Sequence, residues 1–290
     1  MANPETGRVT IEHDVVFGTG GGRDLKCNVY TPPHQGSDRP ALLLVHGGGW
    51  ATGDRSQLHG YGILIGRLGY VCVATEYRLS GESKWPAQLQ DVKACLRWMR
   101  ANAAKLGIDS KKISVSGNSA GAHLALMVAG TPNIAEFEGE GGNAGCTTDV
   151  AACISIYGPA QLYAPAGDRP ADYFSFLFGR GYTEETARRA SPLAHVNADW
   201  PPTLLITGNK DELVPVESSF KMYKALTEAG VRAELHVYEG APHAFDREPA
   251  FGRQCASIMA LFMDRTVVNP RVLSAAASDA IRRDVSAARA

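Results

Sequence analysis

The stretch VSGNSAGAHLA, residues Val115–Ala125, places a serine between two glycines where an apolar strand gives way to an alanine-rich helix. Gly117 and Gly121 weaken extended structure. Their presence indicates that the backbone at this turn needs space that a side chain would occupy. GNSAG fits the G-x-S-x-G pattern, a sharp strand-to-helix turn that presents a serine hydroxyl at the edge of a sheet. A simple helix cap is the alternative interpretation of Ser119, so other parts of the chain must support a catalytic one.

Apolar strand candidates and helical patterns alternate from residue 40 onward. The strand candidates are short, rich in β-branched residues and apolar at consecutive positions, as expected for strands that are covered on both faces. This alternation predicts an α/β fold with a mainly parallel, doubly wound sheet and helices on both faces. The strand candidates are residues 41–45, 70–77, 112–117, 151–158, 203–208 and 233–240, and helical stripes occupy 89–106 and 251–262.

The remaining segments suggest one domain over residues 1–265. Two N-terminal strands flank a glycine cluster, which we interpret as a hairpin turn because a phosphate-binding loop would open a helix. Residues 159–201 are too long for an ordinary connection and are expected to form a lid insertion. Residues 131–149 are glycine-rich and acidic, typical of a surface excursion, and 266–290 are expected to form a helical or frayed tail.

Composition excludes several classes of protein. The chain of 290 residues has a formal net charge of −1, which argues against nucleic acid as a partner. It contains no apolar run long enough to span a membrane, and the N-terminus lacks the apolar segment of a signal peptide. The six cysteines form no CxxC pair, so buried thiols in the cytoplasm are expected, and a Cys146–Cys153 bridge has no support. No residue cluster has metal-ligand spacing, so neither a metal nor a cofactor is expected.

A glycine-rich loop follows strand candidate 41–45. His46, three glycines and Trp50 form this HGGGW stretch, whose N–H groups are unobstructed by side chains. In the predicted sheet the loop lies at the same edge as Ser119. We expect the N–H groups of Gly47 and Gly48, together with that of Ala120, to form an oxyanion hole.

A serine nucleophile needs a base, and the base needs an orienting carboxylate. Strand candidate 203–208 leads to Asp211 and strand candidate 233–240 leads to His243, in the chain order nucleophile, acid, histidine. Both lie at the edge that carries Ser119. We therefore predict a Ser119–His243–Asp211 triad. The weaker candidates are Glu212, Asp246 and Asp199 for the acid and His46, His123 and His236 for the base, with structural roles more expected for the three histidines.

Five motifs in this order resemble the α/β-hydrolase fold, and most closely the bacterial hormone-sensitive-lipase-like carboxylesterases with short caps, including feruloyl and acetyl esterases. The resemblance covers roughly residues 20–265 and implies the same triad and oxyanion donors. This chain differs in having Asn118 where relatives often have Asp, and in lacking a long N-terminal helical cap. The motifs are HGGGW (46–50), EYRLSGESKWPAQLQDV (76–92), GNSAG (117–121), NKDELVP (209–215) and APHAF (241–245).

The expected activity is hydrolysis of small, uncharged, short-acyl esters through an acyl-enzyme on Ser119. Trp50, Asn118 and the aromatic segment 174–178 are candidate walls of the substrate pocket. Two alternatives stay open, an arylformamidase-type amidase and a non-catalytic receptor for a small ligand on the same fold. The sequence does not decide the oligomeric state, and a homodimer is one of the states it allows.

Overall fold

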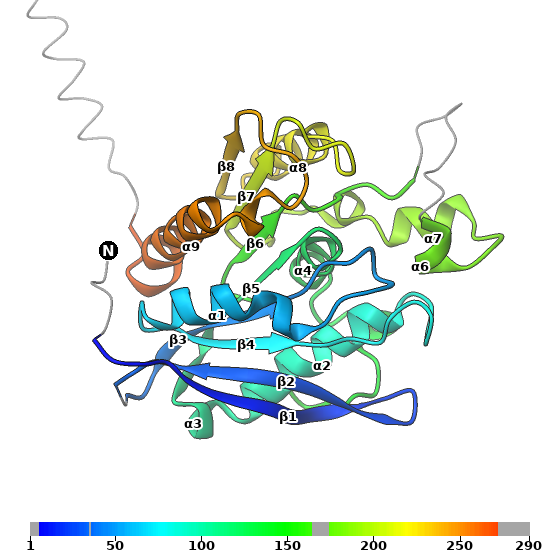
Figure 1. The fold of residues 1–290 in the computed structure, drawn as a ribbon. Helices are drawn as coiled ribbons and strands as arrows, with labels where there is room; N and C mark the ends of the chain where they lie inside the picture. The colour runs from blue at the N-terminus through cyan, green and yellow to red at the C-terminus, as the bar shows by residue number, and fades with distance from the viewer. Residues whose placement is uncertain (1–5, 35, 164–173, 272–290) are drawn as a thin grey trace, which may run out of the picture.

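The computed structural model describes residues 6–34, 36–163 and 174–271. Eight strands form one sheet in the order β1-β2-β4-β3-β5-β6-β7-β8 (Figure 1). The β1–β2 and β2–β4 pairs are antiparallel and all the other pairs are parallel. The predicted α/β architecture, a mainly parallel sheet between helices, is confirmed. The strands are β1 (Thr10–Gly20), β2 (Arg23–Thr31), β3 (Arg39–Val45), β4 (Val71–Thr75), β5 (Ile108–Asn118), β6 (Cys153–Ile156), β7 (Thr203–Gly208) and β8 (Ala233–Tyr238).

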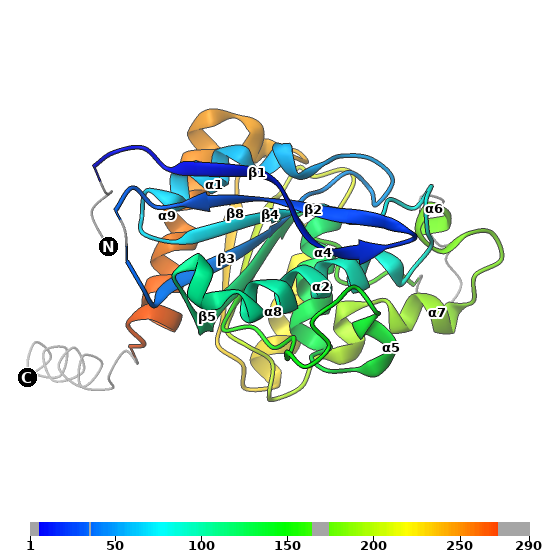
Figure 2. The same cartoon turned by 90° about the horizontal axis from the view of Figure 1, so that it is seen from below.

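Helices cover both faces of the sheet (Figure 2). One face packs against α2, α4 and α8, whose residues share a core cluster with Leu43 and Val115. The other face packs against α1 and α9, which contact each other and share a second cluster with Leu42 and Ile154. The helices are α1 (His59–Gly66), α2 (Ala87–Ala101), α3 (Ala103–Leu106), α4 (Ala120–Gly130), α5 (Ala135–Glu138), α6 (Phe174–Phe178), α7 (Glu184–Arg189), α8 (Glu217–Glu228) and α9 (Pro249–Met263), with short 3-10 turns η1 (Arg55–Leu58), η2 (Pro192–His195) and η3 (Phe245–Arg247) and a π-helical turn η4 (Asp264–Val268).

The register of the central strands brings two glycine-containing turns together. Val45, the last residue of β3, pairs with Gly117 near the end of β5. Because parallel strands end at the same edge, the loop after β3 and the turn after β5 are neighbours. On the far side of β5, Asn118 pairs with Ile156 of β6.

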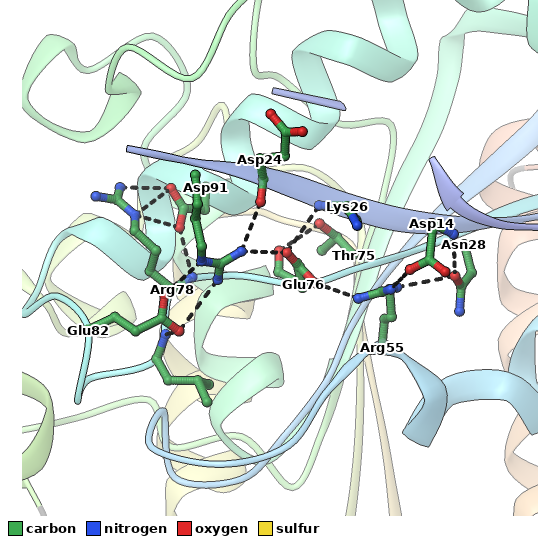
Figure 3. A network of polar contacts seen from close by, with 12 residues as sticks. Asp14, Asp24, Lys26, Asn28, Arg55, Thr75, Glu76, Arg78, Glu82 and Asp91 are labelled. Carbon is green, nitrogen blue, oxygen red and sulfur yellow. Dashed lines mark hydrogen bonds and ion pairs between the residues drawn. The ribbon is translucent and has the colours of Figure 1, made fainter. Parts of the chain in front are cut away.

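A network of ion pairs joins the N-terminal hairpin to the rest of the sheet (Figure 3). Glu76, just after β4, accepts hydrogen bonds from Arg23 of β2 at 2.7 Å and from Arg55 of η1 at 2.5 Å. Arg55 also pairs with Asp14 of β1. Nearby, Arg78 forms a forked pair with the buried Asp91 of α2. These contacts hold both antiparallel strands against the segment that leads into α2.

The segment 131–149 lies on the surface, and two buried cations anchor it. The Nζ of Lys93 donates to the Oε1 of Glu138 at 2.8 Å, and Arg97 donates to Oε2 of the same carboxylate at 2.9 Å. Burial lowers the pKa of Lys93 from its ordinary value. Phe137 packs into the core beside them. These ion pairs therefore anchor the acidic segment 131–149 to α2.

Several expectations concern segments described only in part. Of the predicted lid at 159–201, residues 164–173 lie outside the described residues, as do 272–290 of the predicted tail. The six cysteines are free, five of them buried and Cys146 partly exposed, so no Cys146–Cys153 bridge is present. No helix within residues 6–34, 36–163 or 174–271 is both long enough and apolar enough to cross a bilayer.

Candidate active site

Ser119 occupies the turn between β5 and α4 with a strained backbone. Its φ of 54° and ψ of −121° lie in a region that side chains seldom adopt. The turn is held because the N–H of Ser119 donates to the carbonyl of Ile156 at 2.9 Å, and its own carbonyl accepts from the N–H of His123 at 3.1 Å. Such geometry, fixed from both sides, is typical of a nucleophile elbow.

The two glycines of the elbow are required by close backbone contacts. A Cβ on Gly117 would lie 2.3 Å from the carbonyl carbon and oxygen of Gly121. A Cβ on Gly121 would lie 2.1 Å from the carbonyl oxygen of Val45 at the end of β3. The start of α4 can therefore press against the neighbouring strand only because both side chains are absent.

The three residues of the predicted triad lie in hydrogen-bonding contact. Nε2 of His243 lies 2.9 Å from Oγ of Ser119, and Nδ1 lies 2.7 Å from Oδ2 of Asp211. The other carboxylate oxygen of Asp211 accepts from the N–H groups of Leu213 and Val214, at 2.9 and 2.8 Å. The acid side chain is fully buried and thus fixed in orientation. Serine, imidazole and carboxylate form one continuous chain.

The competing residues lie elsewhere. His236 contacts Glu234 at 2.7 Å, and Asp199 is exposed. His46 and His123 are buried, and burial lowers the pKa of each imidazole, that of His123 to about 4. Glu212 directly follows Asp211 and is exposed, and Asp246 contacts two tyrosines instead of His243.

The loop after β3 lies beside Ser119. A Cβ on Gly47 would lie 3.2 Å from the Cβ of Ser119. No carbonyl in the described part of the chain accepts a hydrogen bond from the N–H groups of Gly47, Gly48 or Ala120. These donors can therefore serve a ligand.

Residues of the 76–92 motif hold this loop in place. Tyr77 stacks on His46 with ring centroids 4.3 Å apart and donates its hydroxyl to the carbonyl of His46 at 3.1 Å. The N–H of Ser80 donates to the carbonyl of Trp50 at 2.8 Å. The sequence showed this motif only as a resemblance, and the structure gives its physical role as the support of the glycine loop.

A cavity of about 450 Å³ opens above the serine. The elbow, the glycine loop and His243 form its floor, and Phe176 and Leu213, both more than half exposed, lie at its mouth. Trp50 and Asn118, predicted as wall residues, line the cavity, and of the predicted segment 174–178 Phe176 alone is among its lining residues. Trp50 is itself 2 % exposed, and its Nε1 donates to Nδ1 of His123 at 3.2 Å, so its indole also supports the elbow helix.

A tyrosine–aspartate network beside His243 was not predicted from the sequence. The Nδ2 of Asn118 donates to the hydroxyl of Tyr157 at 3.3 Å, and that hydroxyl donates to Asp246. Tyr61 donates to the same carboxylate at 2.9 Å. Burial and the charge of Asp246 raise the pKa of both tyrosines above the ordinary value. Tyr157 also packs on the imidazole of His243, with ring centroids 4.7 Å apart.

In residues 6–34, 36–163 and 174–271, no group of three or more His, Cys, Asp or Glu side chains is placed to hold an ion. The groups that lie together at this site are the hydroxyl of Ser119, the imidazole of His243 and the carboxylate of Asp211.

The sheet topology, the strained serine turn and the Ser–His–Asp contacts define a protein of the α/β-hydrolase fold. The family model described as BD-FAE matches residues 27–226, more than half of the chain, and the chain belongs to this family. The resemblance of this chain to hormone-sensitive-lipase-like esterases, which the motifs predicted, is confirmed by its similarity to the curated esterases described next.

Curated relatives include esterase LipC of Mycobacterium tuberculosis, which is 33 % identical over 78 % of this chain and 58 % of LipC. The probable carboxylic ester hydrolase LipM of the same species is 34 % identical over 71 % of this chain and 49 % of LipM. The chain thus spans about half the length of the curated relatives it matches. Among solved structures, esterase Est2 of Thermogutta terrifontis superposes with a TM-score of 0.77, at 28 % identity, over 90 % of this chain and 93 % of Est2.

Proposed function

We propose that this protein is a serine carboxylesterase that hydrolyses small, uncharged, short-acyl esters through an acyl-enzyme on Ser119. The contact of His243 with both Ser119 and Asp211, at 2.9 and 2.7 Å, carries the proposal. A base in contact with the hydroxyl is what a non-catalytic receptor would not need. The esterase names of the relatives support the same reaction class.

In the first half-reaction, Oγ of Ser119 attacks the ester carbonyl carbon while Nε2 of His243 takes its proton. The negative charge that develops on the carbonyl oxygen is stabilised by the N–H groups of Gly47, Gly48 and Ala120. The protonated imidazole, oriented by Asp211, then gives its proton to the departing alcohol. In the second half-reaction, water repeats these steps on the acyl-enzyme and releases a carboxylic acid.

The short-acyl preference rests on the shape and character of the pocket. A cavity of about 450 Å³ with Trp50, Phe176 and Leu213 in its wall suits a small apolar group. Structures of Est2 from Thermogutta terrifontis, 28 % and 26 % identical to this chain, are described with propionate and with butyrate bound. The free thiols of the chain fit the cytoplasm as its expected location.

Replacement of the serine tests the proposal. Ser119→Ala removes the nucleophile, so we expect hydrolysis of p-nitrophenyl butyrate to fall by about 10⁴-fold or more. The matched control is Ser116→Ala, because this serine lies on the same strand and is buried away from the pocket. Circular dichroism of both variants verifies the fold.

Labelling provides a second arm of this test. A fluorophosphonate should modify the wild-type protein at Ser119 and leave the Ser119→Ala variant unlabelled. Unlabelled wild-type protein, or a Ser119→Ala variant with most of its activity, would overturn the esterase proposal and favour the receptor alternative. A rate with N-formylkynurenine far above that with simple esters would favour the arylformamidase alternative.

A further inference from the structure

A second cavity adjoins the pocket above Ser119. Its volume is about 520 Å³, and it lies between α1 and the first turn of α9, which are neighbours in the fold (Figure 1). The two cavities share Gln57, Asn118 and Arg247 in their walls. We call this second cavity the side chamber, and it is lined by Gln57, Gly60, Tyr61, Leu64, Asn118, Asp246, Arg247, Pro249, Gly252 and Arg253.

Two exposed arginines line the side chamber without a direct partner in the part of the chain that the structure describes. Within the described residues, the guanidinium groups of Arg247 and Arg253 have no hydrogen bond or ion pair, although both side chains line the chamber. The one carboxylate in the wall, Asp246, is 8 % exposed and has both oxygens occupied by the hydroxyls of Tyr61 and Tyr157. Two guanidinium groups against one carboxylate leave the lining of the chamber with a net positive charge.

The remaining lining is mostly apolar. The ring of Tyr61, the side chain of Leu64 and Pro249 supply carbon surface, and Pro249 begins α9, so the partial positive charge of that helix end adds to the cations. An occupant that matches both features has an anionic head and a short apolar tail. Guanidinium groups pair with carboxylates through two parallel hydrogen bonds, which favours a carboxylate head.

The reaction proposed above makes such a molecule inside the neighbouring pocket. When water attacks the acyl-enzyme, the bond between the acyl carbon and Oγ of Ser119 breaks, the serine recovers its proton from His243, and a carboxylic acid leaves. At neutral pH this acid loses its proton to solvent and becomes a carboxylate. An uncharged ester has no negative charge to pair with Arg247 and Arg253, whereas its carboxylate product does.

We propose that the side chamber binds the short-chain carboxylate product, next to and separate from the position where the ester reacts. This inference rests on the proposed esterase function for the origin of the ligand. Product bound there lies beside the shared wall formed by Gln57, Asn118 and Arg247. Accumulated product would thus slow turnover from a site other than the serine.

The test measures butyrate binding when the catalytic pocket is blocked. Ser119 is first converted to its diethylphosphoryl derivative with paraoxon, and sodium butyrate is then titrated by ligand-observed NMR. We expect butyrate to bind the blocked protein, with an affinity that falls as salt is added, and neutral butyramide not to bind. Arg253→Gln, which alters only the side chamber, should raise the Kd about three- to tenfold, and Arg247→Gln should act in the same direction.

Arg67→Gln is the matched control, because Arg67 is an exposed arginine at the other end of α1 without a side-chain partner in the described chain. It should leave the Kd unchanged. Loss of butyrate binding on phosphorylation of Ser119, or an unaltered Kd in the Arg247→Gln/Arg253→Gln double variant, would overturn the side-chamber proposal. If paraoxon fails to modify Ser119, the esterase proposal fails separately, and titration of the unmodified protein still tests the chamber.

Discussion

His123 is an imidazole enclosed in the protein between the indole of Trp50 and the carbonyl of Ala190. Its Nδ1 accepts from Trp50 Nε1 at 3.2 Å, and its Nε2 donates to Ala190 at 2.7 Å. Only the neutral ring with the proton on Nε2 satisfies both contacts. Burial accordingly lowers its pKa to about 4. One residue thus ties the elbow helix to the glycine loop and to the segment that follows α7.

Protonation of His123 should destabilise the fold. An unfolded histidine takes up a proton near pH 6.5 and the folded one near pH 4, so the unfolded state binds more protons in this interval. The stabilisation of the folded state by neutral His123 is fully present above pH 6.5 and is lost as the pH falls toward 4. We expect this group alone to lower the free energy of unfolding by about 3 kcal/mol over that range, measured by urea unfolding.

The His123→Gln variant isolates this effect. It should lack this part of the pH dependence, whereas His13→Gln, at an exposed position on β1, should retain it. An identical slope in the wild type and the His123→Gln variant would contradict the assignment.

For single residues, the sequence predicted the candidate site best where a functional side chain directly follows a strand. Ser119, Asp211 and His243 each follow a strand with a clear apolar pattern, and this pattern places them at one edge. Tyr157 and Asp246 had no comparable signal. Their partnership with Tyr61 depends on the contact between α1, η3 and the end of β6, which no local pattern reveals.

The strand-to-helix turn at the end of β5 is the element that sets the position of the nucleophile. It packs against the last residue of β3, so the elbow and the glycine loop that follows β3 are held in contact. The strained backbone of Ser119 is maintained by this packing and by β6 on the other side.

Gly121→Ala should disturb both stability and catalysis. The added Cβ would meet the carbonyl oxygen of Val45 at 2.1 Å, and that oxygen belongs to backbone in the centre of the sheet. We expect a loss of about 2–4 kcal/mol in urea unfolding and a fall in kcat of at least about tenfold.

Gly145→Ala is the control, since a Cβ there meets nothing within 4 Å. It should change neither quantity appreciably. A Gly121→Ala variant with unchanged stability would show that α4 can shift away from β3.

The sequence pattern predicted some helices and not others, and the difference has a physical reason. α2 and α9 carry a clear apolar stripe on one side, and this pattern predicted both helices. α1, with the sequence HGYGILIG, has three glycines and no polar face, so nothing in its pattern indicates a helix. It forms because Tyr61 and Ile65 pack between β4 and α9, a tertiary effect.

At the scale of the whole molecule, ion pairs add to the backbone pairing of β2 with β4 in attaching the N-terminal hairpin. β1 and β2 pair antiparallel at one edge of the sheet. Glu76, which follows β4, accepts hydrogen bonds from Arg23 of β2 and from Arg55 of η1, the turn before α1 (Figure 3). The side chains of Glu76 and Arg55 are 16 % and 19 % exposed, so solvent screens this pair less than an open surface pair.

Glu76→Gln should therefore lower stability by about 1–2 kcal/mol in urea unfolding, and the difference should shrink at high salt. Glu228→Gln removes one partner of the exposed Lys224–Glu228 pair on α8 and should change stability by less than about 0.5 kcal/mol. Equal effects of the two variants would show that the hairpin network contributes no more than an ordinary surface pair.

The three residues of the candidate triad follow three different strands of one sheet. Strand spacing, rather than the length of intervening chain, therefore sets the distances between their reacting atoms. The connections at the opposite edge, such as the turn at Gly230 between α8 and β8, lie away from those atoms. Insertions acquired there during evolution can add new surfaces or fused modules while the hydrolytic centre keeps its geometry.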